Sequence, residues 1–294
     1  MKLGRLNVFV GIVMFFVSVY AQTPIQPADL SKPTKIAPEN FGPNAFPVPD
    51  MLDGATSSDW SVELYSDNYF SNIPSLETEF TSSIFMRLRI PLFTPRANFV
   101  VYGNVFEYFR TPKSVNQFRR VKYDGDVLRK SLVGDIYVST DIMLLTQQKN
   151  YIDLALRAAL KSASGGMYEY ARYYDAPGYF FDATFGRTIN FAYDDMSVKF
   201  ALSGGFLCWQ TDNGRQNDAV MYGAKTVFNI KKFSLSAEYS GYVGWENLGD
   251  APMVLRIDAA YKFSNLAINC GYQAGLMDYP FHRARLGLTY YFNL

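Results

Sequence analysis

The stretch LGLTYYFNL, residues 286–294, closes the chain and decides the fold. Counted back in steps of two, its positions are all apolar or aromatic: Leu294, Phe292, Tyr290, Leu288 and Leu286. Side chains of a β-strand alternate between two faces. The pattern therefore predicts a strand with one apolar face and one face that tolerates water. A soluble β-sandwich contains such strands too, so the architecture depends on the rest of the chain.

The same alternation recurs from Trp60 to the end of the chain. In residues 79–92, for example, Met86 lies on the apolar face and Arg87 on the other. Charges recur in this way in the middle of the segments, always on one side. We predict twelve strands, at about 58–66, 79–92, 97–109, 131–146, 150–162, 178–190, 195–210, 216–230, 232–246, 251–263, 265–276 and 282–294.

The connections between the predicted strands alternate in length. Those after the even-numbered strands are short, whereas those after the odd-numbered strands are generally longer, above all 110–130 and 163–177. A soluble sandwich gives no reason for such sorting, but transmembrane barrels place short turns at one membrane face and long loops at the other. Strands of about 9 to 11 residues suffice to cross a bilayer, and a closed sheet pairs every backbone polar group. Residues 57–294 are thus predicted to form an all-β, transmembrane, antiparallel up-and-down β-barrel of about 12 strands.

The N-terminus has the layout of an export signal. Lys2 and Arg5 precede an apolar run, and Ala21 is followed by Gln22, so residues 1–21 are predicted to be a cleaved signal peptide. The alternative is an N-terminal anchor helix. The apolar run is too short for that role, because a spanning helix needs about 20 apolar residues.

Residues 22–56 are a proline-rich segment that we predict to be a periplasmic N-terminal tail. Half of the 14 prolines of the chain lie between residues 22 and 50, and such a stretch favours polyproline II or disorder over a sheet. The main interpretation is a flexible tether, with residues 22–50 as a candidate contact for a periplasmic partner. The alternative is a docking segment or lumen plug with Phe41 and Phe46 as its anchors.

Together, the signal peptide, the alternating strands and LGLTYYFNL resemble the outer-membrane β-barrel class of Gram-negative bacteria, more narrowly an uncharacterised, porin-like group of about twelve strands. In that class the barrel-assembly machinery reads the last strand, which implies that residues 286–294 are its signal. Leu294 departs from the Phe or Trp that usually ends the signal. The resemblance implies a place in the bacterial outer membrane, in contact with lipid and lipopolysaccharide. Members with twelve strands include solute channels, autotransporter translocators and a phospholipase, so the fold alone selects no function.

The polar faces of the predicted strands carry charges that a barrel turns toward its interior. The predicted pore-lining residues are Arg87, Arg89, Asp135, Asp141, Asp153, Arg157, Lys199, Lys225, Glu238, Arg256, Asp258, Arg283 and Arg285. Mixed charges suit either a narrow hydrated pore or a salt-bridged plug that closes it. We predict a narrow channel that passes small hydrophilic solutes. The alternative is a closed barrel that serves as a structural anchor, adhesin or assembly partner, and an embedded hydrolase ranks below both.

Two long loops carry candidate contact residues. In loop 110–130, we expect a basic group to bind the phosphates of lipopolysaccharide as charge-assisted pairs: Arg119, Arg120, Lys122, Arg129 and Lys130. The alternative is an ordinary solvated loop. The tyrosine-rich segment 164–181 suits either a sugar or peptide ligand at the lumen mouth or an ordinary aromatic girdle.

Little in the sequence points to catalysis. The barrel lipases carry a His-x-Ser pair on one strand face, whereas the only histidine here, His282, is followed by Arg283 and Ala284. One histidine and two separated cysteines form no zinc site, so no metal, cofactor or enzymatic activity is predicted. The formal net charge of +1 gives no reason to expect nucleic acid as a partner.

Overall fold

A computed structural model describes residues 37–53, 59–192, 195–211, 216–245 and 249–292. The predicted signal peptide 1–21, the tail residues 22–36 and Leu294 of the closing motif lie outside the described residues. In the described ranges, no helix is long and apolar enough to cross a membrane.

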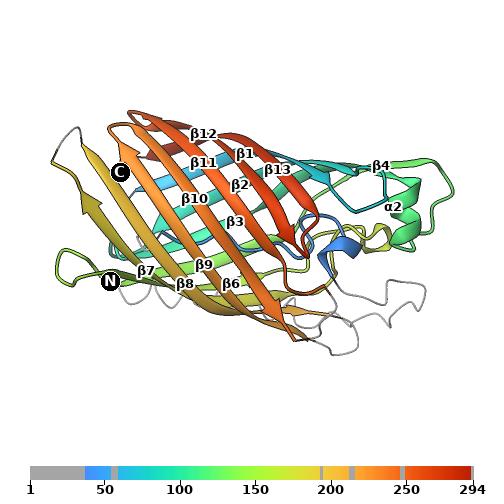
Figure 1. Ribbon diagram of the computed structural model, residues 1–294, viewed down its shortest axis with the longest axis horizontal. Coiled ribbons are helices and arrows are strands. Elements are labelled where there is room, and N and C mark those ends of the chain that lie inside the picture. The colour runs from blue at the N-terminus through green and yellow to red at the C-terminus, as the bar shows by residue number, and fades with distance from the viewer. Residues whose placement is uncertain (1–36, 54–58, 193–194, 212–215, 246–248, 293–294) are drawn as a thin grey trace, which may run out of the picture.

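Twelve antiparallel strands form a closed barrel (Figure 1). They are β1 (Trp60–Ser71), β2 (Phe80–Pro91), β3 (Ala97–Pro112), β5 (Ile136–Leu145), β6 (Asp153–Lys161), β7 (Gly178–Asn190), β8 (Met196–Gln210), β9 (Gln216–Ile230), β10 (Phe233–Gly244), β11 (Met253–Phe263), β12 (Leu266–Met277) and β13 (Phe281–Phe292). The sheet closes because β1 pairs with β2 and β13, while β2 also pairs with β3. Each barrel strand therefore has a neighbour on both sides, as a sheet in hydrocarbon requires. The predicted twelve-stranded barrel is confirmed.

A thirteenth strand, β4 (Val127–Leu132), extends the wall beyond the other strands. The C-terminal half of β3 pairs with β4, and its N-terminal half pairs with β5. The single strand predicted at 131–146 is therefore two strands, and the predicted loop 110–130 contains the end of β3, helix α2 (Lys113–Phe118) and much of β4. The break between β4 and β5 lies at Gly134, where any Cβ would collide with the Tyr173 hydroxyl. The alternation did not reveal this break because its cause is a residue from a distant loop.

The outer face of the barrel is apolar. Large apolar side chains are exposed around the wall, for example Leu64, Ile84, Leu156, Phe200, Leu255 and Leu288. Soluble monomers rarely expose apolar patches of this extent, whereas an outer-membrane barrel turns such a band toward lipid. Exposed aromatic rings beside the short connections complete the band as an interfacial girdle: Phe93, Tyr151, Phe191 and Phe263.

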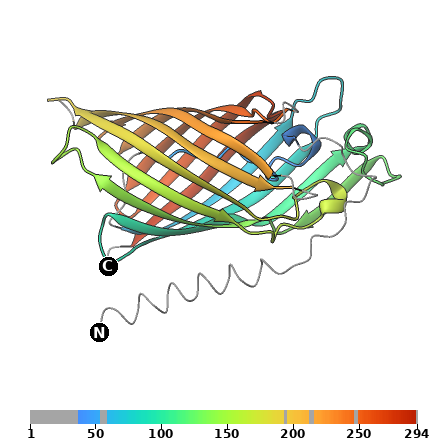
Figure 2. The ribbon, with the colours of Figure 1, turned by 90° about the horizontal axis from the view of Figure 1, so that it is seen from below.

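The two ends of the barrel differ in their connections. One end carries the short turns 92–96, 146–152, 191–195, 231–232 and 264–265. The opposite end carries α2, β4 and the connection 162–177 with its short helix η2 (Tyr168–Tyr170) (Figures 1 and 2). Short turns of outer-membrane barrels face the periplasm and long loops face the exterior. We call these two ends the inner end and the outer end.

Residues 37–53 run through the barrel interior. Their short helix η1 (Pro38–Asn40) lies at the outer end, and the chain continues toward the inner end (Figure 2). Phe41 and Phe46 are each only 2% exposed. For these residues, the structure corresponds to the alternative of a lumen plug and not to a free periplasmic tail, because the wall buries them. We call residues 37–53 the plug segment.

Candidate functional site: the plugged lumen

An aromatic cluster holds the plug segment at the outer end. The ring centroid of Phe41 lies 5.3 Å from that of Phe46 and 5.6 Å from that of Tyr174, both edge-on, and Phe41 also stacks on Tyr168 at 6.3 Å. All four rings belong to or pack against one buried cluster. Aromatic pairs of this geometry contribute about 0.5–1.5 kcal/mol each beyond area burial. The tyrosine-rich loop thus supplies side chains that bind the plug segment.

A buried ion cluster lies at the same end. Arg119 donates to both carboxylate oxygens of Glu79, at 2.9 and 2.8 Å. Arg172 joins two acids, with 2.5 Å to Glu79 and 2.7 Å to Glu107. All four side chains are at most 1% exposed. Two guanidinium groups and two carboxylates balance each other, which is the condition under which such charges tolerate burial.

The protonation states of the loop residues follow from this arrangement. Burial pulls the pKa of Arg172 down, but the Glu107 and Glu79 carboxylates outweigh it and raise the pKa above its ordinary value. Burial, with a further contribution from the Glu107 charge, raises the pKa of Tyr173 well above its usual range. The Tyr173 hydroxyl therefore stays protonated and donates to Glu107 at 2.8 Å.

The plug segment docks on the ion cluster through neutral groups. Asn44 Nδ2 donates to Glu107 at 2.7 Å, and the Glu39 carbonyl accepts from Arg119 Nε at 3.2 Å. Gly42 N–H donates to the Ala171 carbonyl at 2.8 Å. A Cβ on Gly42 would lie 2.6 Å from the guanidinium carbon of Arg172, so the close approach requires glycine there.

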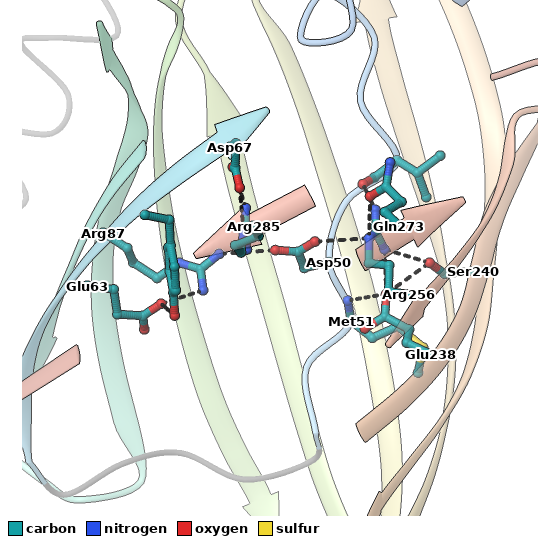
Figure 3. A network of polar contacts seen from close by, with 12 residues as sticks. Asp50, Met51, Glu63, Asp67, Arg87, Glu238, Ser240, Arg256, Gln273 and Arg285 are labelled. Carbon is teal, nitrogen blue, oxygen red and sulfur yellow. Dashed lines mark hydrogen bonds and ion pairs between the residues drawn. The ribbon is translucent and has the colours of Figure 1, made fainter. Parts of the chain in front are cut away.

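Farther into the lumen, Asp50 of the plug segment lies between two wall arginines (Figure 3). One carboxylate oxygen is 3.3 Å from Arg87 and the other is 3.4 Å from Arg256. The backbone is held as well, since Arg256 donates to the Val48 carbonyl at 2.6 Å and Met51 N–H donates to Glu238 at 3.3 Å.

The wall charges also pair with one another. The arginines on either side of Asp50 have wall partners of their own, Glu63 for Arg87 at 3.1 Å and Glu238 for Arg256. Other pairs join neighbouring strands without the plug segment: Arg285 with Asp67 at 2.6 Å, Arg157 with Asp182 at 2.7 Å, Lys161 with Asp135 at 2.6 Å and Lys225 with Glu238 at 3.3 Å. Neighbouring strands thus carry a charge-matched inner surface.

A polar cavity of about 360 Å³ remains beside the plug segment. Asp50 and Met51 line it from the plug segment, and Tyr102 and Arg89 line it from the wall. In the described part of the chain, Arg89 Nε is buried without a hydrogen-bond partner. A polar cavity of this size has room for about a dozen waters.

The predicted pore-lining residues all lie on the inner wall. Those around the cavity are Arg87, Arg89, Asp135, Asp141, Arg157, Lys225, Glu238, Arg256, Asp258, Arg283 and Arg285. The remaining two, Asp153 and Lys199, pair with each other at 3.5 Å. The structure brings these residues together around a plugged lumen and not around an open one.

The predicted lipopolysaccharide contacts divide into two groups. Arg120, Lys122, Arg129 and Lys130 are exposed at the outer end, where Lys130 lies over the Tyr170 ring at 4.4 Å. Arg119 does not fit the prediction of a lipopolysaccharide contact, because its side chain is fully buried in the ion cluster and is not available to lipid. The remaining four stay candidate lipopolysaccharide contacts.

Sequence reasoning missed several charged residues of this site, including Glu63 on β1. Asp50 and Arg172 lie outside the predicted strands, and Asp67 lies just beyond the predicted end of the first strand. A longer reading of that strand would have found Asp67, because polar and tyrosine side chains continue to alternate up to Ser71. Strict alternation along the predicted strand 97–109 would turn Glu107 to the outer face, but a β-bulge opposite Ile84 and Phe85 shifts the parity of β3 and turns Glu107 inward.

The structure gives His282 a structural setting. Its ring stacks on Tyr272, and Nδ1 lies 3.0 Å from the Tyr272 hydroxyl. Asp278, the acid that a barrel protease would need beside it, accepts instead from the Ala251 N–H at 3.2 Å. Among the described residues, no group of three or more His, Cys, Asp or Glu side chains is arranged to hold a metal ion.

The closed barrel, its apolar outer band and its charged interior define a porin-like transmembrane barrel of the outer membrane. No protein family matches the chain, and no curated protein does so either. Similar solved structures include the KdgM porin in complex with disordered oligogalacturonate (13% identity, 78% of this chain and 99% of that chain, TM-score 0.44) and the Acinetobacter baumannii outer membrane protein Omp33 (14%, 80% and 99%, 0.44). A third is the transport unit of the autotransporter AIDA-I from Escherichia coli (11%, 88% and 100%, 0.49). These likenesses are distant, so the class rests on the geometry of the barrel itself.

Proposed function

We propose that the barrel is an outer-membrane channel for small hydrophilic solutes, closed by its own plug segment. The pairing of the wall charges is the observation that carries the proposal. Removal of the plug segment breaks the Asp50 contacts, yet Arg87 keeps Glu63 and Arg256 keeps Glu238. The plug segment can therefore leave without stranding a buried charge on the wall, the event that makes breaking a buried pair costly.

The dimensions of the lumen support small solutes. Barrels of eight strands are filled by side chains, and those of 16 to 18 strands leave a wide channel, so twelve strands give an intermediate bore. Small residues that line the cavity, such as Ser234 and Ser236, add to the space. Paired charges of both signs favour hydrated polar solutes over apolar ones.

Planar-bilayer conductance of the purified full-length protein tests the proposal. The plug-weakened variant Phe41→Ala/Phe46→Ala/Asp50→Asn removes both aromatic anchors and the carboxylate that pairs with Arg87 and Arg256. We expect low, infrequent current from the natural protein and at least a tenfold rise in open probability from the variant.

The matched control changes the same residue types outside the lumen. In Phe185→Ala/Phe200→Ala/Asp126→Asn, two lipid-facing rings and one exposed loop carboxylate are altered, so the current should stay at the level of the natural protein. A plug-weakened variant that inserts, keeps heat-modifiable migration on gels and still passes no current would overturn the channel proposal.

The alternative function is a closed barrel that acts as an anchor or adhesin. The observation that favours it is the closure of the outer end, where aromatic and ionic clusters bury Phe41, Phe46 and Arg172 almost completely. On this alternative the plug segment is a permanent core, so its weakening lowers stability without opening a path. Conductance and stability measured on the same variant separate the two functions.

A further inference from the structure

The contacts of Asp50 define a place for a carboxylate inside the lumen (Figure 3). One of its oxygens lies 3.3 Å from Arg87 Nη2, and the other lies 3.4 Å from Arg256 Nε. Guanidinium groups bind carboxylates through charge-assisted contacts of this kind. The Asp50 side chain is 32% exposed and lines the polar cavity beside the plug segment. We call the space between the two guanidinium groups the carboxylate position.

The wall fixes Arg87 independently of Asp50. Its Nη1 donates to Glu63 at 3.1 Å, whereas Nη2 contacts Asp50. The guanidinium carbon also lies 5.2 Å from the ring centroid of Phe85 and 5.4 Å from that of Tyr102. A cation within about 6 Å of an aromatic ring centroid is attracted to the ring. Departure of Asp50 therefore leaves Arg87 in place, with Nη2 as a donor available to the lumen.

The wall fixes Arg256 in a similar way. Its Nε donates to Gln273 at 2.8 Å, and its Nη1 donates to Ser240 at 2.8 Å and to Glu238. Its Nη2 donates to the plug segment, at the Val48 carbonyl. When the plug segment leaves, Nη2 loses this acceptor and Nε loses the nearby Asp50 charge. Because arginine stays charged in proteins, both guanidinium groups then lack a partner on the lumen side.

The charges around the cavity also depend on the plug segment. The wall residues that line the cavity include seven cations and five acids, namely Arg87, Arg89, Arg157, Lys225, Arg256, Arg283 and Arg285 against Asp67, Asp135, Asp141, Glu238 and Asp258. Three further described wall residues, Glu63, Asp182 and Lys161, pair with members of this set, and with them one positive charge remains in excess. The plug segment adds Asp50 and Asp53 to the lining. Its departure therefore turns a slight excess of negative charge into a slight excess of positive charge.

Two more arginines provide hydrogen-bond donors beside the same cavity. The Nε atoms of Arg89 and Arg283 are buried, and neither has a hydrogen-bond partner in the described part of the chain. Arg283 is 6% exposed, and its Nε lies 4.0 Å from the Asp67 carboxylate. Buried polar groups nearly always have a hydrogen-bond partner. Unused donors in this cavity favour a ligand that carries acceptor oxygens.

We infer that the carboxylate position is a binding site for small solutes that carry a carboxylate, and that the Asp50 side chain occupies this site while the barrel is closed. The solute carboxylate binds between Arg87 and Arg256 after the plug segment leaves. The inference rests on the proposed function and names the class of solute that the channel prefers. A bound solute and a docked Asp50 exclude each other, so the solute favours the open state.

Chemical rescue tests the site without any measurement of current. Asp50→Ala in the full-length protein removes the carboxylate, and acetate can replace it, whereas acetamide is a neutral molecule of the same shape. Urea titration in lipid vesicles, followed by tryptophan fluorescence, gives the folding equilibrium. A ligand at ten times its dissociation constant shifts this equilibrium by about elevenfold. We expect acetate to shift it at least fivefold relative to sodium chloride of equal ionic strength, and acetamide to have no effect. The natural protein should not respond to acetate, because Asp50 fills its site.

Bilayer recording of the plug-weakened variant tests the site in the open lumen. Gluconate should reduce the chloride current at a concentration at least tenfold lower than sorbitol, a neutral polyol of the same length. Addition of Arg87→Gln/Glu63→Gln removes one guanidinium of the site together with its wall partner, so the net charge stays the same. This change should raise the half-inhibiting gluconate concentration at least tenfold. Lys113→Gln/Asp126→Asn, which removes an exposed pair of opposite charges, is the matched control and should leave it unchanged.

The two experiments distinguish failure of the site from failure of the channel. Equal effects of acetate and acetamide on Asp50→Ala would overturn the inference, and so would a gluconate block that is unchanged in the Arg87→Gln/Glu63→Gln variant. Rescue by acetate without any current from the plug-weakened variant would support the carboxylate site and overturn the channel. Heat-modifiable migration confirms that each variant is folded in the membrane.

Discussion

The ion cluster at the outer end makes Arg172→Met the most informative single substitution. Methionine keeps much of the length and the apolar stem of arginine but removes the charge. Glu79 retains Arg119, which bonds both of its oxygens, and Thr111 at 2.7 Å. Glu107 is left with two neutral donors, Asn44 at 2.7 Å and Tyr173 at 2.8 Å. The substitution therefore leaves one buried carboxylate without a counter-ion.

Removal of one partner from a buried pair destabilises a protein by about 3–5 kcal/mol. Hydration of Glu107 would lower the cost of its unpaired charge with the least disruption of the barrel. Water reaches Glu107 only when the plug segment leaves its position over the cluster. A change of about 3 kcal/mol corresponds to a factor of roughly 100 in the opening equilibrium. The double variant Arg172→Met/Glu107→Gln removes both charges, and the hydrogen bonds from Asn44 and Tyr173 can persist. It should recover most of the lost stability, because removal of both partners is nearly neutral.

Two measurements check this cycle. Guanidinium titration in lipid vesicles, followed by tryptophan fluorescence, gives the unfolding free energy, and bilayer recording gives the open probability. Arg129→Met, at an exposed position, controls for the loss of an arginine and should change neither quantity. The reasoning is refuted if Arg172→Met matches the natural protein, or if the double variant is as unstable as the single one. In the second case the loss arises from packing and not from an unpaired charge.

Three further predictions concern the plug segment and the lumen. Gly42→Ala places a methyl group 2.6 Å from a buried guanidinium and should raise the open probability, whereas Gly166→Ala, with nothing within 4 Å, should leave bilayer currents unchanged. Protonation of Asp50 removes its ion pairs with Arg87 and Arg256, so docking should weaken as the pH falls below the ordinary range of an aspartate, about 4. Currents should therefore be steady from pH 7 to about 5 and rise only below about 4, and Asp50→Asn should remove this acid step. In the plug-weakened protein, Arg89→Glu should shift the reversal potential in a salt gradient toward cation selectivity, and the exposed control Arg110→Glu should not.

The barrel was predictable because its signals are local. In a strand that separates lipid from a polar lumen, apolar and polar side chains must alternate at every step. The faces of Met86 and Arg87 can therefore be predicted without reference to any other strand. The sorting of short and long connections adds the orientation. Where prediction failed, the cause was not local: Glu107 faces inward because of a bulge, and the predicted strand 131–146 breaks because Tyr173 packs against Gly134.

The plug segment was harder to predict because its contacts involve few of its own charges. Several of its hydrogen bonds use backbone groups, such as the carbonyls of Pro43, Phe46 and Val48. Backbone groups are the same for every residue type, so no pattern of side chains records them. Phe41 and Phe46 were the available signal, and they supported docking without indicating a direction. The sequence does not indicate that Asp50 is a docking residue, because its partners Arg87 and Arg256 are identified only in the structure.

The loop that carries Arg172 adds a physical link between the plug segment and the outer end. Two residues of this loop that are not glycine, Met167 and Ala171, adopt left-handed backbone conformations with φ of 63° and 54°. Such residues cost of order 1 kcal/mol or more each and persist where the surroundings hold them. Here Arg172, next to Ala171, is held by Glu79 and Glu107, and the Ala171 carbonyl accepts from Gly42 of the plug segment. Release of the plug segment removes the hydrogen bond from Gly42 to this strained loop. Departure of the plug segment therefore favours rearrangement of the loop at the outer end, and rearrangement of the loop favours departure of the plug segment.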